Sequence, residues 1–263
     1  MNGKEARDYY NLKGDQACSA TEASPPMAVN DGPAEWDWRD HNGVSPVKDQ
    51  GNCGSCWTFS TTGCLESLHM IQYGTLQTYS EQQLIDCAGG FENYGCNGGL
   101  PSHAFEYLYY MGGITSEAAY PYTAVDGTCN IAKDPIMLNV FYGAYNITAG
   151  DEVQLANAVY GVGPVSVAFQ VVDDFFSYTS GVYSSDTCGN TEMDVNHAVL
   201  AVGYGTDLET GMDYWLIKNS WGTEWGDQGF FKIERGVNMC GIAECNSLPV
   251  QIWEHRCKGT EDE

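Results

Sequence analysis

The chain has 263 residues and a formal net charge of −24, and 43% of its residues are hydrophobic. This length can form one large domain or two packed halves with a substantial core. The negative charge argues against partners such as nucleic acid and anionic membrane surfaces. No run approaches the 18 apolar residues of a membrane-spanning helix, so we expect neither nucleic acid nor membrane among the partners.

Eleven cysteines are more than most cytosolic proteins contain, and they indicate an oxidising compartment with several disulfides. Met1 is followed by a polar stretch without the apolar core of a signal peptide. We therefore expect a form that lacks its targeting and pro-segments, from a lysosomal, vacuolar or secreted protein. The sequon at Asn146 (Asn-Ile-Thr) agrees with a secretory route and predicts N-glycosylation there.

The first half of the chain is predicted to be helical after a polar start. Residues 1–34 contain turn-forming pairs and are expected to be extended or mobile. Capping residues then delimit three helices, with Gly74 as one C-cap and Pro101 as one start. The predicted helices cover 57–73, 80–87 and 102–111.

In the second half of the chain, the sequence pattern changes from one typical of helices to one typical of strands. After a short helix near 151–160, runs of β-branched and aromatic residues are separated by glycine-containing turns, which predicts strands. The predicted strands cover 165–172, 197–204, 214–218 and 230–234. Helices followed by strands predict an α+β fold, and a cleft between the two halves is the expected place for a site.

A Cys-Gly-Ser-Cys motif at Cys53–Cys56 carries the chemistry. By itself such a pair could be a redox centre, half of a metal site or the end of a disulfide. Cys56, however, opens the predicted helix 57–73, and a helix N-terminus favours a thiolate. The side-chain amide of Gln50 could donate to a developing oxyanion. We therefore predict that Cys56 is a nucleophile.

A nucleophilic thiol needs an imidazole and a group that orients that imidazole. His197 begins the apolar run 198–205; without a candidate nucleophile it would be interpreted as a strand-end histidine. Asn219 by itself would be a turn residue. It lies close to Trp221, which could shield an imidazole–amide hydrogen bond from water.

Together, these motifs resemble the papain-like cysteine proteases. Cys-Gly-Ser-Cys-Trp is a signature of that family, and matching residues extend from Trp38 to Pro249. The resemblance implies a two-domain fold, with a helical left domain, a β-barrel-like right domain and the active-site cleft between them. It implies acyl transfer through a thioester, without metal or cofactor. The catalytic residues that it assigns are Cys56, His197, Asn219 and Gln50.

The resemblance also implies a peptide-binding surface. Gly98 and Gly99 would form an edge where an extended peptide pairs with the main chain. The adjoining side-chain pocket is expected to be apolar and to prefer hydrophobic side chains. Its residues would be Leu100, Pro101, Ala168, Val195 and Ala198, with Trp221 as a further substrate-binding residue.

Several segments are most similar to cathepsin H and to the plant aleurains. Asp15–Thr21 is similar to the mini-chain of cathepsin H, a propeptide remnant that a disulfide holds in the non-primed half of the cleft. If the chain is cut after Thr21, the new carboxylate would bind the α-ammonium group of a substrate. This predicts an aminopeptidase, and the alternative is that Cys18 is an ordinary disulfide cysteine.

The resemblance further implies disulfides and domain boundaries. The implied pairs are Cys53–Cys96, Cys87–Cys129, Cys188–Cys240 and Cys18–Cys245. Cys64 is expected to be a buried thiol, and the state of Cys257 is left open. The expected parts are a propeptide remnant (1–33) with a mini-chain-like segment at about 14–21 and an excisable spacer, a catalytic domain (34–250) and an acidic tail (251–263).

The predicted function is that of a cysteine peptidase of the aminopeptidase type, with some endopeptidase activity. One alternative is a plain endopeptidase, and another is an inactive storage or binding relative, which would have lost a catalytic residue. Expected partners are peptides and proteins with a free N-terminus, the protein's own propeptide or mini-chain, and cystatin-type inhibitors. The protein is expected to be a monomer.

Overall fold

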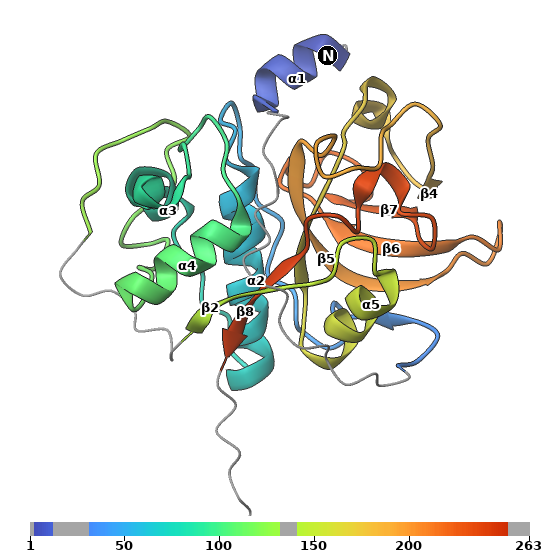
Figure 1. The fold of residues 1–263 in the computed structure, drawn as a ribbon, viewed down its shortest axis with the longest axis horizontal. Helices are drawn as coiled ribbons and strands as arrows, with labels where there is room; N and C mark the ends of the chain where they lie inside the picture. The colour runs from blue at the N-terminus through green and yellow to red at the C-terminus, as the bar shows by residue number, and fades with distance from the viewer. Residues whose placement is uncertain (1–2, 13–31, 132–140, 252–263) are drawn as a thin grey trace, which may run out of the picture.

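The computed structural model describes residues 3–12, 32–131 and 141–251. Helix α2 (Cys56–Tyr73) runs through the middle of the molecule, as Figure 1 shows. Helices α3 (Glu81–Cys87) and α4 (Pro101–Met111) lie on one side of it, and most of the sheet lies on the other. The predicted α+β class, with a helical half and a sheet half, is confirmed.

Helix α2 is buried from Cys56 to Leu68, because it lies between the two halves and is covered on all sides. Small residues let the sheet approach it closely. A Cβ atom on Gly63 would lie 3.1 Å from the side chain of Leu200 in the sheet. The helix ends as predicted at Gly74, which has a φ of 70°.

The other predicted helices are confirmed, with ends that differ by at most one residue. The Ser80 hydroxyl caps α3 by accepting a hydrogen bond from the Gln83 backbone N–H. Helix α4 begins at Pro101 and ends before Gly112. Asp151 caps α5 (Glu152–Gly161). Three short 3-10 helices, η1, η2 and η3, span Ala88–Phe91, Asp173–Ser177 and Met239–Gly241.

The strands form one sheet with the order β2-β8-β3-β5-β6-β7-β4, and β1 pairs with β5. All pairs are antiparallel except that of β4 with β7. In chain order, β1 to β8 are Trp36–Asp37, Phe141–Asn146, Val165–Phe169, Val182–Tyr183, His197–Thr206, Asp213–Lys218, Phe230–Glu234 and Ser247–Gln251.

The expectation of a β-barrel-like half is wrong, because the sheet is open. Its end strands, β2 and β4, do not pair with each other. Strand β4 has only two residues, and β2 packs against α4 at the opposite end. Because α4 covers the β2 edge of the sheet, this edge is protected without pairing to another strand.

The polar start of the chain contains a helix, α1 (Gly3–Tyr10), so the expectation of an extended segment is wrong for these residues. Figure 1 shows α1 above the junction of the two halves. The ring of Tyr10 stacks on Trp221 at a centroid distance of 4.4 Å. Contact with the folded protein thus supports a helix that is too short and polar to be stable alone.

Three disulfides join the pairs Cys53–Cys96, Cys87–Cys129 and Cys188–Cys240. Cys245 is also disulfide-bonded, but Cys18, its expected partner, lies outside the described residues, as does Cys257. Cys64 is a buried free thiol that donates to the Pro164 carbonyl. None of the described helices is long and apolar enough to cross a membrane.

Candidate active site

Cys56 is the first residue of α2, which places its sulfur at the positive end of the helix dipole. The backbone N–H of Ala198, in β5, donates a hydrogen bond to Sγ at 3.5 Å. The thiol therefore lies where the helical half meets the sheet. Only the tertiary structure creates this contact, since 142 residues separate the two partners.

His197 is the first residue of β5 and is 1% exposed. Its Nε2 lies 2.8 Å from Oδ1 of Asn219, which directly follows β6. The Trp221 ring stacks on the His197 ring, with the two centroids 4.8 Å apart. Nδ1 has no hydrogen-bond partner among the described residues.

Gln50 is fully buried and is held from two directions. Its Nε2 donates to the Cys53 carbonyl at 2.9 Å, and its Oε1 accepts from Oγ of Ser220 at 2.7 Å. Ser220 was not selected from the sequence, because a serine next to Asn219 carries no distinguishing signal. The Ser220 contact orients the amide so that its NH₂ group faces the start of α2.

Burial dominates the titration of the two reacting groups. It raises the pKa of the Cys56 thiol to about 11, although nearby backbone N–H groups act in the opposite direction. It lowers the pKa of the His197 imidazole to about 4, against the effect of the hydrogen bond to Asn219. In this covered arrangement both groups favour their neutral forms.

A cavity of about 110 Å³ adjoins Cys56 and His197. It is lined by every residue predicted for the peptide edge and the side-chain pocket, namely Gly98, Gly99, Leu100, Pro101, Ala168, Val195 and Ala198. Gly99 lies so close to Trp57 that a Cβ atom would be 2.7 Å from the indole ring. Trp221, Gln50 and Asn219 lie outside the cavity lining, whereas Thr21 lies outside the described residues.

The cavity is more polar than the sequence suggested. Glu192, Glu244 and Asn246 also line it, together with Cys245. Asn146, the predicted glycosylation residue, lines it as well and is only 8% exposed. Glycosylation of Asn146 stays a prediction. Among the described residues no group of three His, Cys, Asp or Glu side chains could hold a metal ion.

The residues after α1 enter the site, which the sequence did not indicate. The Asn11 side chain donates to the Cys96 carbonyl at 2.6 Å, and Asn11 lines the cavity beside Cys56. The Gln50 amide also lies 3.5 Å from the Tyr10 carbonyl. A Cβ atom on Gly54 would lie 2.7 Å from the Asn11 carbonyl, so this close approach depends on glycine.

Comparisons with known proteins agree with this geometry. Residues 32–250 match the family described as "Papain family cysteine protease". A cysteine and a histidine held by an asparagine, between a buried helix and a sheet, define this class of protein. The chain belongs to the papain family of cysteine proteases.

Within this family, the chain is similar to several individual proteins. It is 62% identical to "Pro-cathepsin H" of Medicago truncatula over 83% of this chain and 61% of that protein. It is 57% identical to "Thiol protease aleurain-like" of Arabidopsis thaliana over 92% of this chain and 67% of that protein. The chain therefore spans about three fifths to two thirds of the length of these relatives.

A solved structure shows the same fold. Digestive procathepsin L2 from the larval midgut of Tenebrio molitor matches with a TM-score of 0.86 at 42% identity. The match covers 95% of this chain and 81% of that one. The similarity includes both the helical half and the sheet half.

Proposed function

We propose that this chain is a cysteine peptidase that hydrolyses peptide bonds through a thioester on Cys56. The observation that carries the proposal is His197, which lies in one cleft with the thiol and is held by Asn219 at 2.8 Å. The thiol, the imidazole and the orienting amide are the three parts that nucleophilic thiol catalysis requires.

The geometry suggests the order of the chemical steps. Sγ of Cys56 attacks the carbonyl carbon of the scissile bond, and its proton passes to Nδ1 of His197. The imidazolium gives this proton to the leaving amine, and the C–N bond breaks to leave a thioester. Water, deprotonated by His197, then attacks the thioester, and the acid is released as the thiol regains its proton.

The carbonyl oxygen becomes an anion at each addition step and needs donors that are already in place. We assign this role to the Gln50 side-chain amide and the Cys56 backbone N–H. The assignment of the Gln50 amide is supported by its two hydrogen bonds, to Cys53 and to Ser220. These bonds fix the orientation of the amide before substrate binds.

We further propose that the enzyme is of the aminopeptidase type, with the mini-chain-like segment 14–21 in the non-primed half of the cleft. Cys245 supports this, since it lines the cavity and is disulfide-bonded. The names of the relatives, cathepsin H and aleurain, support it as well. A carboxylate at Thr21, produced by cleavage there, would bind the substrate's α-ammonium group.

The remaining proposals concern the partners of the protein and its location. We propose peptide and protein substrates with a free N-terminus, together with the protein's own propeptide, as partners. Three disulfides among the described cysteines support a lysosomal, vacuolar or secreted location. The segment 3–12 supports the propeptide proposal, because it lies against Gln50 and Trp221.

Two fluorogenic substrates test the function, one with a free α-amine and one with the same sequence and a blocked N-terminus. We expect faster turnover of the free-amine substrate in the presence of reductant, and no turnover by Cys56→Ser. Activity that persists in Cys56→Ser would refute the thiol mechanism. Faster turnover of the blocked substrate would leave a cysteine peptidase but refute the aminopeptidase type.

A further inference from the structure

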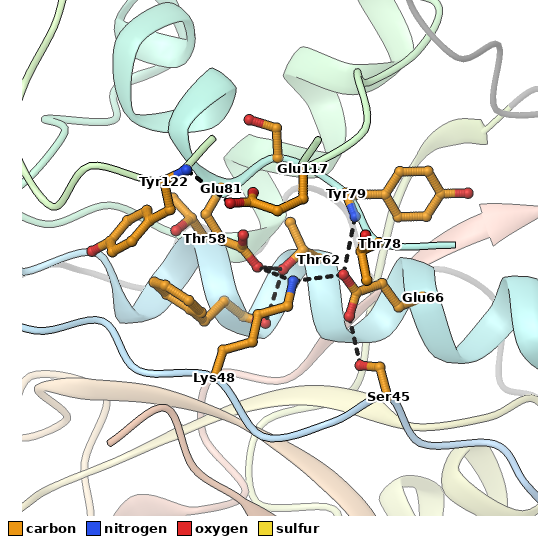
Figure 2. Close-up of polar contacts among 12 residues, drawn as sticks. Ser45, Lys48, Thr58, Thr62, Glu66, Thr78, Tyr79, Glu81, Glu117 and Tyr122 are labelled. Atoms are coloured by element: carbon orange, nitrogen blue, oxygen red, sulfur yellow. Dashed lines mark hydrogen bonds and ion pairs between the residues drawn. The ribbon is translucent and has the colours of Figure 1, made fainter. Parts of the chain in front are cut away.

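Figure 2 shows Ser45, Glu66, Lys48 and Glu81 joined by hydrogen bonds and ion pairs, and Lys218 on the sheet extends this series through its hydrogen bond to Ser45. We call it the buried charge chain. Its members, from the sheet to the helical half, are Lys218, Ser45, Glu66, Lys48 and Glu81. None of them belongs to the catalytic or substrate-binding residues described above.

The contacts of the chain are continuous. The Lys218 ammonium group donates to Oγ of Ser45 at 2.9 Å, and that hydroxyl donates to Oε2 of Glu66 at 2.5 Å. Lys48 lies 2.6 Å from a carboxylate oxygen of Glu66 and 2.6 Å from one of Glu81. The Glu66 and Glu81 side chains are 0% and 1% exposed. The two carboxyl groups and Lys218 are thus buried, whereas the Lys48 side chain that joins the carboxyl groups is 23% exposed.

Ser45 is the junction of this chain. Among the described residues, Lys218 forms no ion pair with a carboxylate, and its hydrogen bond goes to Ser45. Ser45 is 2% exposed and links the charge on the sheet to the charges on the helices. Without the hydroxyl, the ammonium group of Lys218 would be buried without this acceptor, an arrangement that proteins avoid.

Both ends of the active site are attached to this chain through the backbone. Lys48 is two residues before Gln50, and its carbonyl accepts from the Gly222 N–H at 3.1 Å. The Gln50 N–H donates to the Ser220 carbonyl at 2.9 Å. On the sheet, Lys218 directly precedes Asn219, the residue that holds His197. A displacement of either lysine would therefore move an active-site side chain.

A small cavity joins the two regions directly. Its volume is about 20 Å³, and its lining includes Lys48, Glu66 and Lys218 together with Asn219 and Ser220. Members of the charge chain and the residue that holds His197 thus line one cavity. Burial also lowers the pKa of Lys218 to about 8, so the charged form of this lysine is disfavoured at its position.

We propose that Ser45 and Lys218 are positioning residues, which hold Gln50 and Asn219 in register with Cys56 across the two halves. The reason is geometric: the thiol lies on α2, while its imidazole and orienting amide lie on the sheet. An interdomain link that leads into the backbone at both sites fixes their relative positions. This inference rests on the proposed function in one respect, since a turnover assay requires peptidase activity. Chemical labelling of Cys56 tests it without that activity.

The test uses Ser45→Ala and Lys218→Met in the full chain. The first readout is the rate at which a neutral alkylating reagent labels Cys56 between pH 5 and 9, with the labelled peptide identified by mass spectrometry. The second is kcat and KM, with kcat normalised to titrated sites. We expect labelling at neutral pH and kcat to fall about tenfold, with KM within about twofold. The inflections of the labelling profile shift in both variants.

Ser166→Ala is the matched control. Ser166 is a fully buried serine that also joins the halves, since its Oγ lies 2.6 Å from that of Ser60 on α2. It makes no contact with the charge chain. We expect a lower Tm for this control but an unchanged labelling profile, whereas Lys218→Met loses activity without a loss of Tm.

The outcomes separate the explanations. Equal losses in the two serine variants, or unchanged labelling in Ser45→Ala and Lys218→Met, would overturn the proposal. If Ser45→Ala does not fold, Lys218→Met decides by itself. If the unaltered protein labels at Cys56 but hydrolyses no peptide, the proposed function fails, and labelling still decides the role of the charge chain.

Discussion

At the scale of single residues, the side chains that orient His197 and Gln50 are distinct from the thiol that we propose to react. Asn219 and Trp221 leave His197 one exchangeable nitrogen, Nδ1, while Nε2 is committed to the amide. Gln50 is likewise held at its oxygen by Ser220. Side chains that are fixed before substrate binds need no reorganisation when charge develops, which is the physical basis of preorganised catalysis.

Gln50→Ala tests this directly. Loss of one oxyanion donor is expected to lower kcat by about 10² to 10³, with little change in KM, because the donor acts mainly in the transition state. Steady-state kinetics with a fluorogenic peptide measure the effect. A kcat within about threefold of the unaltered protein would contradict the assignment of Gln50.

At the scale of elements, α1 and the residues after it lie against the active site. The Tyr10 ring stacks on Trp221, and the residues after α1 line the cavity beside Cys56. Burial is the largest contribution to the raised pKa of Cys56. We predict that the N-terminal segment contributes to this burial and so favours the neutral thiol, which is the unreactive form.

Tyr10→Ala should loosen this cover. Readmitted water stabilises charge, so the pKa of Cys56 should fall from about 11 and that of His197 should rise from about 4. The midpoint of Cys56 alkylation is then expected at a lower pH, and peptidase activity at neutral pH should rise.

Tyr9→Ala is the control for this prediction, because Tyr9 is 40% exposed and its ring packs edge-to-face with that of Tyr10. Alkylation rates measured across pH 5 to 11 make the comparison. Identical profiles for Tyr10→Ala and the unaltered chain would show that α1 does not control access to the thiol.

At the scale of the whole molecule, the buried charge chain joins the halves at an energetic cost. Two carboxylates share the ammonium group of Lys48, and desolvation raises the pKa of Glu81 to about 7. In the folded state Glu81 therefore holds a proton at pH values where the unfolded chain has released it. Folded stability from this residue falls as the pH rises from about 4.5 to about 7.

Glu81→Gln should remove this dependence. The unaltered protein is expected to lose unfolding free energy across that pH window, and the variant should show a flatter profile. Urea denaturation at several pH values between 4.5 and 7 measures the difference. Parallel profiles would contradict the raised pKa, and Glu152→Gln, a substitution outside the charge chain, serves as the control.

Local signals account for what could be predicted of the fold. Ser80, Pro101 and the glycines after the helices mark ends that depend on a few neighbouring residues. Strands β3, β5, β6 and β7 were visible as β-branched and aromatic runs. Strands β2 and β8 were missed, since their pairing joins segments more than 100 residues apart and neither has a strong pattern of its own.

The sequence by itself determined the α+β class, the main helices and the residue types of a thiol hydrolase, because these depend on local chemistry and on the Cys56 motif. Only the tertiary structure decided that the sheet is open, that the segment after α1 enters the cleft, and that Glu192 and Glu244 line the cavity. It alone assembled the link from Lys218 through Ser45 to Glu66, whose outer members are about 150 positions apart. Such contacts arise from packing between distant segments, and no local pattern encodes them.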